Sequence, residues 1–149
     1  MSRQLPVADD LECRNLVSRY AHYADAGELD LFADLFLTDG VWRRENVPPK
    51  EHGGSGLPAE DKVGHAALKE MIDTAIIKQF NRRFRHQFTD VLIEPGDSPD
   101  TAKGRARALI TDWRSGPGKI AMCGNYTFGF TKTPAGWKFS LVSIYVFPD

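Results

Sequence analysis

The sequence is poor in cysteine and contains no recognisable metal-binding motif. Its two cysteines, Cys13 and Cys123, are too few for a disulfide framework, and no CxxC pair or Cys/His cluster indicates zinc. His22, His52 and His65 also lack partners at the spacing of metal ligands. We therefore expect two reduced cysteines that behave as small apolar residues, and no metal site.

Long apolar runs and an excess of charge are also missing. No uninterrupted apolar stretch approaches the roughly 20 residues of a membrane-spanning helix, and the start, MSRQLPVADDLE, lacks the apolar segment of a signal peptide. The net charge of −1 creates no field that would recruit nucleic acid or an anionic membrane. These absences predict a soluble, cytoplasmic protein that binds neither nucleic acid nor a membrane.

The apolar content that is present suits one compact domain over residues 1–149, because 42% of the chain is hydrophobic and 11% is aromatic. A first helix follows Asp9 and Asp10, and its apolar side chains share one face: Cys13, Leu16, Val17, Tyr20 and Ala24. Gly27 interrupts this helix. We expect a short second helix with four apolar positions: Leu29, Phe32, Leu35 and Phe36.

The centre of the chain changes from helix to turn, strand and loop. Residues 38–40, TDG, predict a turn before a first strand, VWRRE. Residues 46–60 are rich in proline and glycine and predict a long loop, either a lid or partner contact or a plain surface excursion. Asp61 precedes a third helix with two apolar rows: Val63, Ala67, Met71 and Ala75, and beside them Leu68, Ile72 and Ile76.

The remainder of the chain alternates strand-like and turn-like segments. Extended segments cover residues 84–94, 103–114, 119–132 and 137–147, and Pro- and Gly-rich turns separate them. Such regular punctuation predicts an antiparallel meander. With the helices at the front, the expected class is α+β, in which a curved, mainly antiparallel sheet wraps around the apolar face of three N-terminal helices.

This element order, with RYAHYADAGELDLFADLFLTDGVW and GNYTFGFTKTPAGWKF, resembles the SnoaL-like branch of the nuclear-transport-factor-2-like superfamily. The resemblance spans nearly the whole chain and implies a cone-shaped barrel around a mostly apolar pocket. Relatives include dehydratases, isomerases, epoxide hydrolases, polyketide cyclases and small subunits of ring-hydroxylating dioxygenases. Function therefore has to be inferred from the site.

Dehydratase-like members carry an Asp after the first helix and a His at the start of the strand after the third helix. Asp25 in YADAGELD and His86 in RRFRHQFTDVLIE match these two positions. The resemblance therefore implies a catalytic Asp–His pair, with Tyr20 as a hydrogen-bond donor. An imidazole suits proton removal beside a carbonyl, and a carboxylate on its other nitrogen fixes the tautomer.

Other chemistries of the superfamily fit less well. Trp42, Arg43 and Arg44 stand about where ketosteroid isomerase has its basic Asp. The segment RARALITDW has arginines without the acid that the epoxide hydrolases need, and residues 104–107 lack the second His of scytalone dehydratase. Elimination or isomerisation by one Asp–His pair remains and needs no cofactor or metal.

Strand periodicity adds candidate substrate-binding residues. Phe88 and Asp90 alternate with His86 on one face of its strand, so Asp90 lies in the cone if His86 does. Tyr126 and Phe128 share a face of a later strand. The candidate substrate-binding set is Trp42, Phe88, Asp90, Tyr126 and Phe128.

Structural roles compete with each of these assignments. Asp25 also suits a helix cap, His86 and Tyr20 suit the core, and the aromatic stripe around Tyr126 suits a core or oligomer interface. Residues 81–85, NRRFR, suit a solvated rim as well as an anion site.

Two hypotheses follow from these observations. The first is a cofactor-independent lyase or isomerase, specifically a dehydratase, that acts on a small hydrophobic ring compound bearing a hydroxyl or carbonyl group. The second is a non-catalytic ligand-binding or assembly subunit that resembles a dioxygenase small subunit, in which Asp25 and His86 need not touch. We expect a homodimer or homotrimer in either case.

Overall fold

The structure is a computed structural model that describes residues 4–52 and 59–149. Its helical elements are α1 (Val7–Ala26), α2 (Leu29–Asp34), the short 3-10 helix η1 (Lys50–His52), α3 (His65–Ile72) and the π-helix η2 (Asp73–Gln79) that continues it. The strands are β1 (Phe36–Arg44), β2 (Lys62–Val63), β3 (Phe84–Pro95), β4 (Thr101–Asp112), β5 (Lys119–Thr133) and β6 (Gly136–Phe147).

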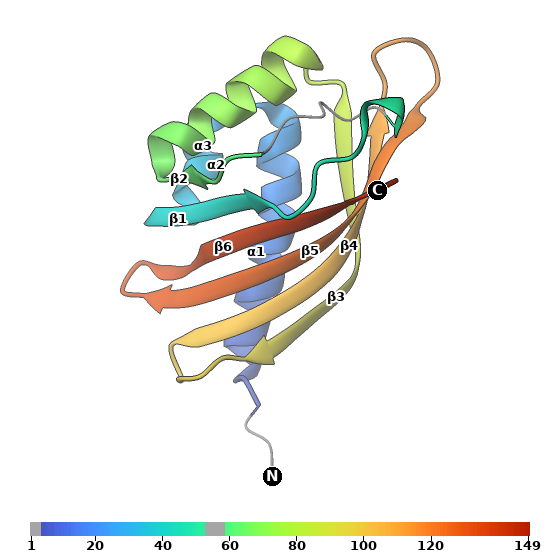
Figure 1. The fold of residues 1–149 in the computed structure, drawn as a ribbon. Coiled ribbons are helices and arrows are strands. Elements are labelled where there is room, and N and C mark those ends of the chain that lie inside the picture. Colours follow the sequence, from blue (N-terminus) through green and yellow to red (C-terminus); the bar gives the residue numbers. More distant parts are fainter. Residues whose placement is uncertain (1–3, 53–58) are drawn as a thin grey trace.

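The six strands form one open, curved sheet in the order β2-β1-β6-β5-β4-β3. Strands β3 to β6 are consecutive and antiparallel, which confirms the predicted meander. Strand β1 returns parallel to β6, and β2 pairs with its outer edge. Figure 1 shows α1 behind this curved sheet, with α3 across one end. The expected α+β cone is confirmed.

Helix α1 lies along the concave side of the sheet, and the predicted apolar stripe is the face that it buries. Each of its five members is at most 3% exposed: Cys13, Leu16, Val17, Tyr20 and Ala24. Gly27 ends the helix in the left-handed conformation, with φ of 69°, and its N–H donates to Ala24 O. Glycine suits this position because it has no Cβ to clash there.

The second helix and the predicted turn differ from expectation. Helix α2 ends at Asp34, so Phe36 is the first residue of β1 rather than a helix residue. Strand β1 also continues through residues 38–40, where a turn was predicted. Its register against β6 shifts between Phe36 and Val41, so the turn-forming residues form an irregularity within a strand. The pairing with β6 skips residues 37–40, and Gly40 O instead accepts a hydrogen bond of 3.0 Å from Gly64 N–H.

The third helix begins later than its apolar pattern predicts. Val63 lies in β2, pairs with Val41 and is 55% exposed, so it is not a helix residue. The row Leu68, Ile72 and Ile76 is buried as predicted. Of the predicted loop 46–60, residues 50–52 form η1, and residues 53–58 lie outside the described residues.

Large and small side chains divide the interior between a filled end and an open end. The filled part holds Phe32, Phe36, Phe128, Phe130 and Phe139, each at most 1% exposed. The inward positions of β4 are small or aliphatic: Ala102, Gly104, Ala106, Ala108 and Ile110. A Cβ on Gly104 would lie 2.8 Å from the Phe130 ring, so glycine leaves room for this ring against β4.

We predict that Gly27→Ala destabilises the protein more than Gly116→Ala. Both glycines have positive φ, which costs an L-residue roughly 1–2 kcal/mol. A Cβ at Gly27 would also lie 2.9 Å from Arg82 Nε and from Ile77 Cγ1, whereas none lies within 4 Å at Gly116. Urea denaturation measures both free energies of unfolding. Equal losses would show that the packing around the end of α1 does not constrain this glycine.

Candidate active site

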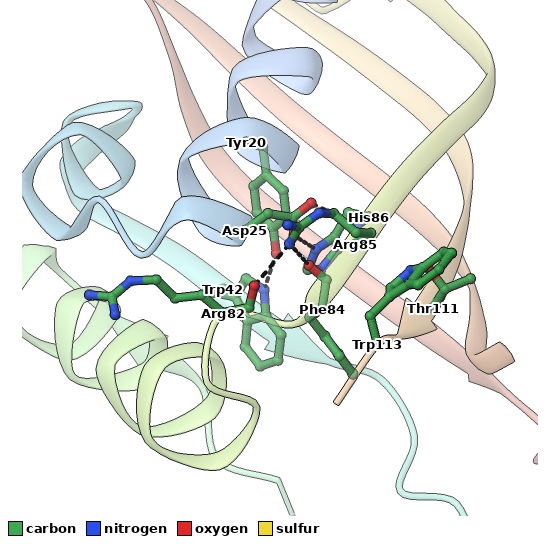
Figure 2. A network of polar contacts seen from close by, with 9 residues as sticks. All are labelled: Tyr20, Asp25, Trp42, Arg82, Phe84, Arg85, His86, Thr111 and Trp113. Atoms are coloured by element: carbon green, nitrogen blue, oxygen red, sulfur yellow. Dashed lines mark hydrogen bonds and ion pairs between the residues drawn. The ribbon is translucent and has the colours of Figure 1, made fainter. Parts of the chain in front are cut away.

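The Asp25 carboxylate holds His86 with two hydrogen bonds. Asp25 Oδ1 lies 2.6 Å from His86 Nδ1, and Asp25 Oδ2 accepts a hydrogen bond of 2.9 Å from the His86 backbone N–H. Both side chains are largely buried, with 8% of His86 and 13% of Asp25 exposed. Figure 2 shows the two side chains facing each other between α1 and β3. The two residues predicted as a pair are therefore in direct contact.

The local sequence explains why these two residues meet. Asp25 lies in the last turn of α1, on the side of the helix that faces β3. His86 is the third residue of β3 and shares the inward face with Phe84. Because Asp25 bonds both the backbone and the ring of His86, it sets the position of the strand and the orientation of the imidazole together.

A cavity of about 490 Å³ lies on the inner side of His86. Its polar wall contains Tyr20, Trp42, Arg44, His86 and Tyr126. Its apolar wall comes mainly from α3 and η2, through Met71, Ile72 and Ile76, and from Phe80 and Phe84. With Nδ1 directed at Asp25, His86 has Nε2 as its remaining ring nitrogen for a ligand in this cavity.

Tyr20 and Tyr126 bring two hydroxyl groups to the same cavity. Trp42 Nε1 donates a hydrogen bond of 2.9 Å to the Tyr20 hydroxyl oxygen. Burial raises the pKa of Tyr20 well above its usual value, although hydrogen bonding with Trp42 and Tyr126 opposes this shift. Burial, followed by the neighbouring Tyr20, likewise raises the pKa of Tyr126. Both groups therefore stay neutral near pH 7 and can donate hydrogen bonds.

A second, more open cleft of about 660 Å³ lies on the outer side of the pair. It is lined by Asp25 and His86 together with His22, Arg83, Arg85 and Trp113. Arg85 is held there by the backbone, since its Nη1 donates to Arg82 O and Phe84 O (Figure 2). His86 thus lies between two cavities, of which the inner one is the less open. The inner cavity is the better substrate site because Tyr20 and Tyr126 line it together with His86.

Among the predicted substrate-binding residues, Trp42 and Tyr126 line the cavity. Phe88 and Phe128 instead pack beneath it, where the Phe88 ring lies 4.8 Å from Tyr126 and 6.2 Å from Phe128 between centroids. Their position along the strand, rather than their face, therefore keeps these two rings out of the cavity.

Asp90 does not point into the cone, contrary to the alternation expected from His86. The pairing of β3 with β4 shifts between Thr89 and Leu92, and Asp90 has a φ of 54°. This irregularity reverses the inward and outward positions, because one extra residue inverts the period of two. The Asp90 side chain is 62% exposed and accepts a hydrogen bond of 3.1 Å from Arg107 Nη1.

The described residues contain neither a metal site nor a membrane-spanning helix. Within residues 4–52 and 59–149, no group of three or more His, Cys, Asp or Glu side chains is placed to hold a metal ion. In the same part of the chain, every helix is too short or too polar to cross a bilayer. His65 Nε2 lies 2.9 Å from Phe36 O, a contact that ties α3 to β1.

A family model described as a SnoaL-like domain matches residues 6–142. The chain belongs to this family. The match confirms the resemblance seen in the sequence and agrees with the open cone of the structure. A search of curated proteins returned no match to this SnoaL-like protein.

Solved structures show the same fold. An NTF2-like protein with a cystatin-like fold from Novosphingobium aromaticivorans is 21% identical, with a TM-score of 0.80 over 95% of this chain and 84% of that chain. A second protein from that organism, provisionally assigned as an aromatic ring hydroxylase, is 24% identical, with a TM-score of 0.70 over 98% and 94%.

A third structure, from Catenulispora acidiphila in complex with S-DNPA, is 18% identical, with a TM-score of 0.72 over 95% of each chain. At these identities the three likenesses establish the fold alone.

The sequence does not predict two parts of the cavity wall in this SnoaL-like protein. By sequence, Arg44 is only a departure from the isomerase pattern, whereas in the structure it lines the cavity together with Trp42, two residues before it in β1. The period of two along VWRRE is the signal that places Trp42 and Arg44 on one face. Met71 and Ile72 were interpreted only as helix core. No sequence signal separates a cavity wall from a core face.

We predict that Tyr20 and Tyr126 ionise only at strongly alkaline pH. Since the folded state raises both pKa values, it binds more protons than the unfolded state above pH about 10. The free energy of unfolding should therefore fall as the pH rises past that value. Absorbance titration at 295 nm and urea denaturation measure the two effects.

The Tyr126→Phe variant is the control, because it removes one of the two buried phenols. It should lack part of the late ionisation step and lose less stability at high pH. Ionisation of all four tyrosines in one step near pH 10, while the protein remains folded, would contradict the prediction.

Proposed function

We propose that this SnoaL-like protein is a cofactor-independent lyase, specifically a dehydratase that acts on a small hydrophobic ring compound bearing carbonyl and hydroxyl groups. One observation carries the proposal. The Asp25 carboxylate lies 2.6 Å from His86 Nδ1, and His86 lines a largely apolar cavity. A carboxylate-oriented imidazole at the wall of such a cavity is a competent general base.

The two hydrogen bonds of Asp25 support one tautomer of His86. A carboxylate oxygen at 2.6 Å from Nδ1 accepts a hydrogen bond from the N–H of that nitrogen, so the lone pair of the neutral ring belongs to Nε2. The second carboxylate oxygen is already engaged by the His86 backbone N–H at 2.9 Å, which prevents the carboxylate from rotating away. The ring therefore offers Nε2 to the ligand in a fixed orientation.

Dehydration then needs only proton transfers at this nitrogen. His86 Nε2 removes a proton from the carbon beside the substrate carbonyl, and the electron pair of the C–H bond forms an enolate. The C–O bond of the hydroxyl group at the next carbon then breaks as a C=C bond forms. The protonated imidazole, stabilised by Asp25, returns the proton to the departing oxygen, which leaves as water.

Tyr20 supplies a hydrogen bond to oxygen in this scheme. Its hydroxyl oxygen accepts from Trp42 Nε1, so its own hydrogen is directed elsewhere. Burial keeps the phenol neutral by raising its pKa. A neutral, positioned donor in an enclosed cavity stabilises an enolate oxygen more than it stabilises the ground-state carbonyl. The Tyr126 hydroxyl, beside it, is hydrogen-bonded to the Tyr20 hydroxyl.

The solved relatives support this proposal only in general terms. The Catenulispora acidiphila structure of the same fold is a complex with S-DNPA, which fits a ligand-holding role for the cone. The provisional ring-hydroxylase assignment of a Novosphingobium aromaticivorans relative agrees with ring compounds as the ligand class.

A non-catalytic ligand-binding or assembly subunit is the second candidate, and one contact favours it. The bond from the His86 backbone N–H to Asp25 ties β3 to α1 whether or not the imidazole reacts. The pair would then serve only as a connection between helix and strand, and turnover would not depend on the imidazole ring. This candidate differs from the first in its response to substitution.

We predict that Asp25→Asn and His86→Gln each lower kcat/KM by about 10²- to 10⁴-fold, the usual contribution of general acid–base catalysis. Asp25 accepts with two different oxygens, and an Asn amide has an NH₂ donor in place of one of them, so Asp25→Asn disturbs the tautomer as well as the contact. Mass spectrometry first identifies any copurified ligand. Rates are then measured on it and on fused-ring β-hydroxy ketones, whose conjugated products absorb in the ultraviolet.

The matched control is Asp90→Asn, since Asp90 lies on the same strand as His86 but is exposed and paired with Arg107. We expect its rate to equal that of the wild type. Melting temperatures show whether each variant is folded. Equal rates in the wild type, Asp25→Asn and His86→Gln would exclude the catalytic pair and favour the binding subunit.

A further inference from the structure

Arg44 places a positive charge on the wall of the cavity. It is the last residue of β1 and lies on the same face as Trp42, and both line the space next to Tyr20 and His86. Its neighbour Arg43 has the opposite orientation and forms an exposed ion pair with Asp61, with 3.0 Å between Nη2 and Oδ2. Two adjacent arginines therefore face different environments.

Within the described residues, Arg44 has no anionic partner. Its Nε is buried and makes no hydrogen bond there, and its Nη2 contacts Met122 Sδ at 3.8 Å, a weak acceptor. No ion pair found among those residues includes Arg44. The remaining segments, residues 1–3 and 53–58, contain no Asp or Glu, so no carboxylate side chain there can neutralise it.

An unpaired guanidinium in a largely apolar cavity is costly, because burial removes water without supplying a counter-charge. The positive charge of Arg44 also affects the two tyrosines of the cavity. It lowers the pKa of Tyr20 and of Tyr126, whereas the negative charge of Asp25 raises both. The two hydroxyl groups are thus influenced by a cation from one part of the site and by the Asp25–His86 pair from another.

We propose that Arg44 binds a carboxylate group of the ligand, so that the substrate is an apolar ring compound that carries a carboxylate. The guanidinium suits this group because its planar N–H donors match the two oxygens of a carboxylate. With the carboxylate at Arg44, the ring occupies the apolar space beside Met71 and Ile76 and its reacting carbon faces His86. This inference rests on the proposed function, because it names the substrate class for the same cavity, and its test measures binding alone.

The test compares naphthalene-2-carboxylate with naphthalene-2-carboxamide, which has the same shape but no charge. Isothermal titration calorimetry at pH 7.5 measures both affinities. We expect the wild type to prefer the carboxylate by about tenfold or more, since a charged hydrogen bond contributes roughly 1.5–3 kcal/mol. In Arg44→Gln the preference should fall to within about twofold, while the affinity for the amide stays close to that of the wild type.

Arg43→Gln is the matched control, because it removes the same charge from the adjacent residue outside the cavity. It should keep the full preference. Arg44→Met provides a second measurement. If the guanidinium is unpaired without ligand, its replacement by an apolar chain of similar length leaves the melting temperature equal to or above that of the wild type.

Equal affinities of the wild type for the two compounds, or no measurable binding of either, would overturn the proposal. An equal loss in Arg43→Gln and Arg44→Gln would also overturn it, because it would reveal a general charge effect. The dehydratase proposal would fail by a different result. If His86→Gln leaves the rate unchanged, the dehydratase proposal is wrong, but this variant should still prefer the carboxylate. If His86→Gln loses activity, that loss does not test the role of Arg44.

Discussion

The contact between Asp25 and His86 is the constraint on which the site depends. One carboxylate accepts hydrogen bonds from the backbone and from the ring of the same residue, and this joins the end of α1 to β3. The position of α1 sets the place of Tyr20, whose hydroxyl group accepts a hydrogen bond from Trp42 on β1. Through these contacts α1 positions both β3 and β1 around one cavity.

The cavity exists because the two parts of the cone are filled differently. Phenylalanine rings fill one end, where Gly104 on β4 leaves room for the Phe130 ring. At the other end, α3 and its π-helical continuation stand away from the sheet and leave about 490 Å³. A π-helical segment is uncommon and occurs often at functional sites. Here it provides Ala75, Ile76 and Gln79 to the cavity wall.

Much of the fold was predictable because its patterns are local. The apolar stripe of α1 and the four strands of the meander follow from periodicity, and the structure confirms them. The predictions that were wrong concern pairing between distant segments. Residues 38–40 have turn chemistry but lie within β1, because pairing with β6 on both sides of them, at Phe36 and at Val41, continues the strand. Asp90 leaves the inward face because the register of β3 against β4 shifts beside it.

The sequence by itself determined the family, the helix that carries Tyr20 and Asp25, and the strand that carries His86, because each of these depends on local pattern and matching motifs. Only the tertiary structure decided that Asp25 and His86 touch, that Phe88 and Phe128 lie beneath the cavity, and that Arg44 faces it without a counter-charge. These features depend on distances between residues far apart in the chain. Such distances are set by sheet curvature and strand register, which no local pattern encodes.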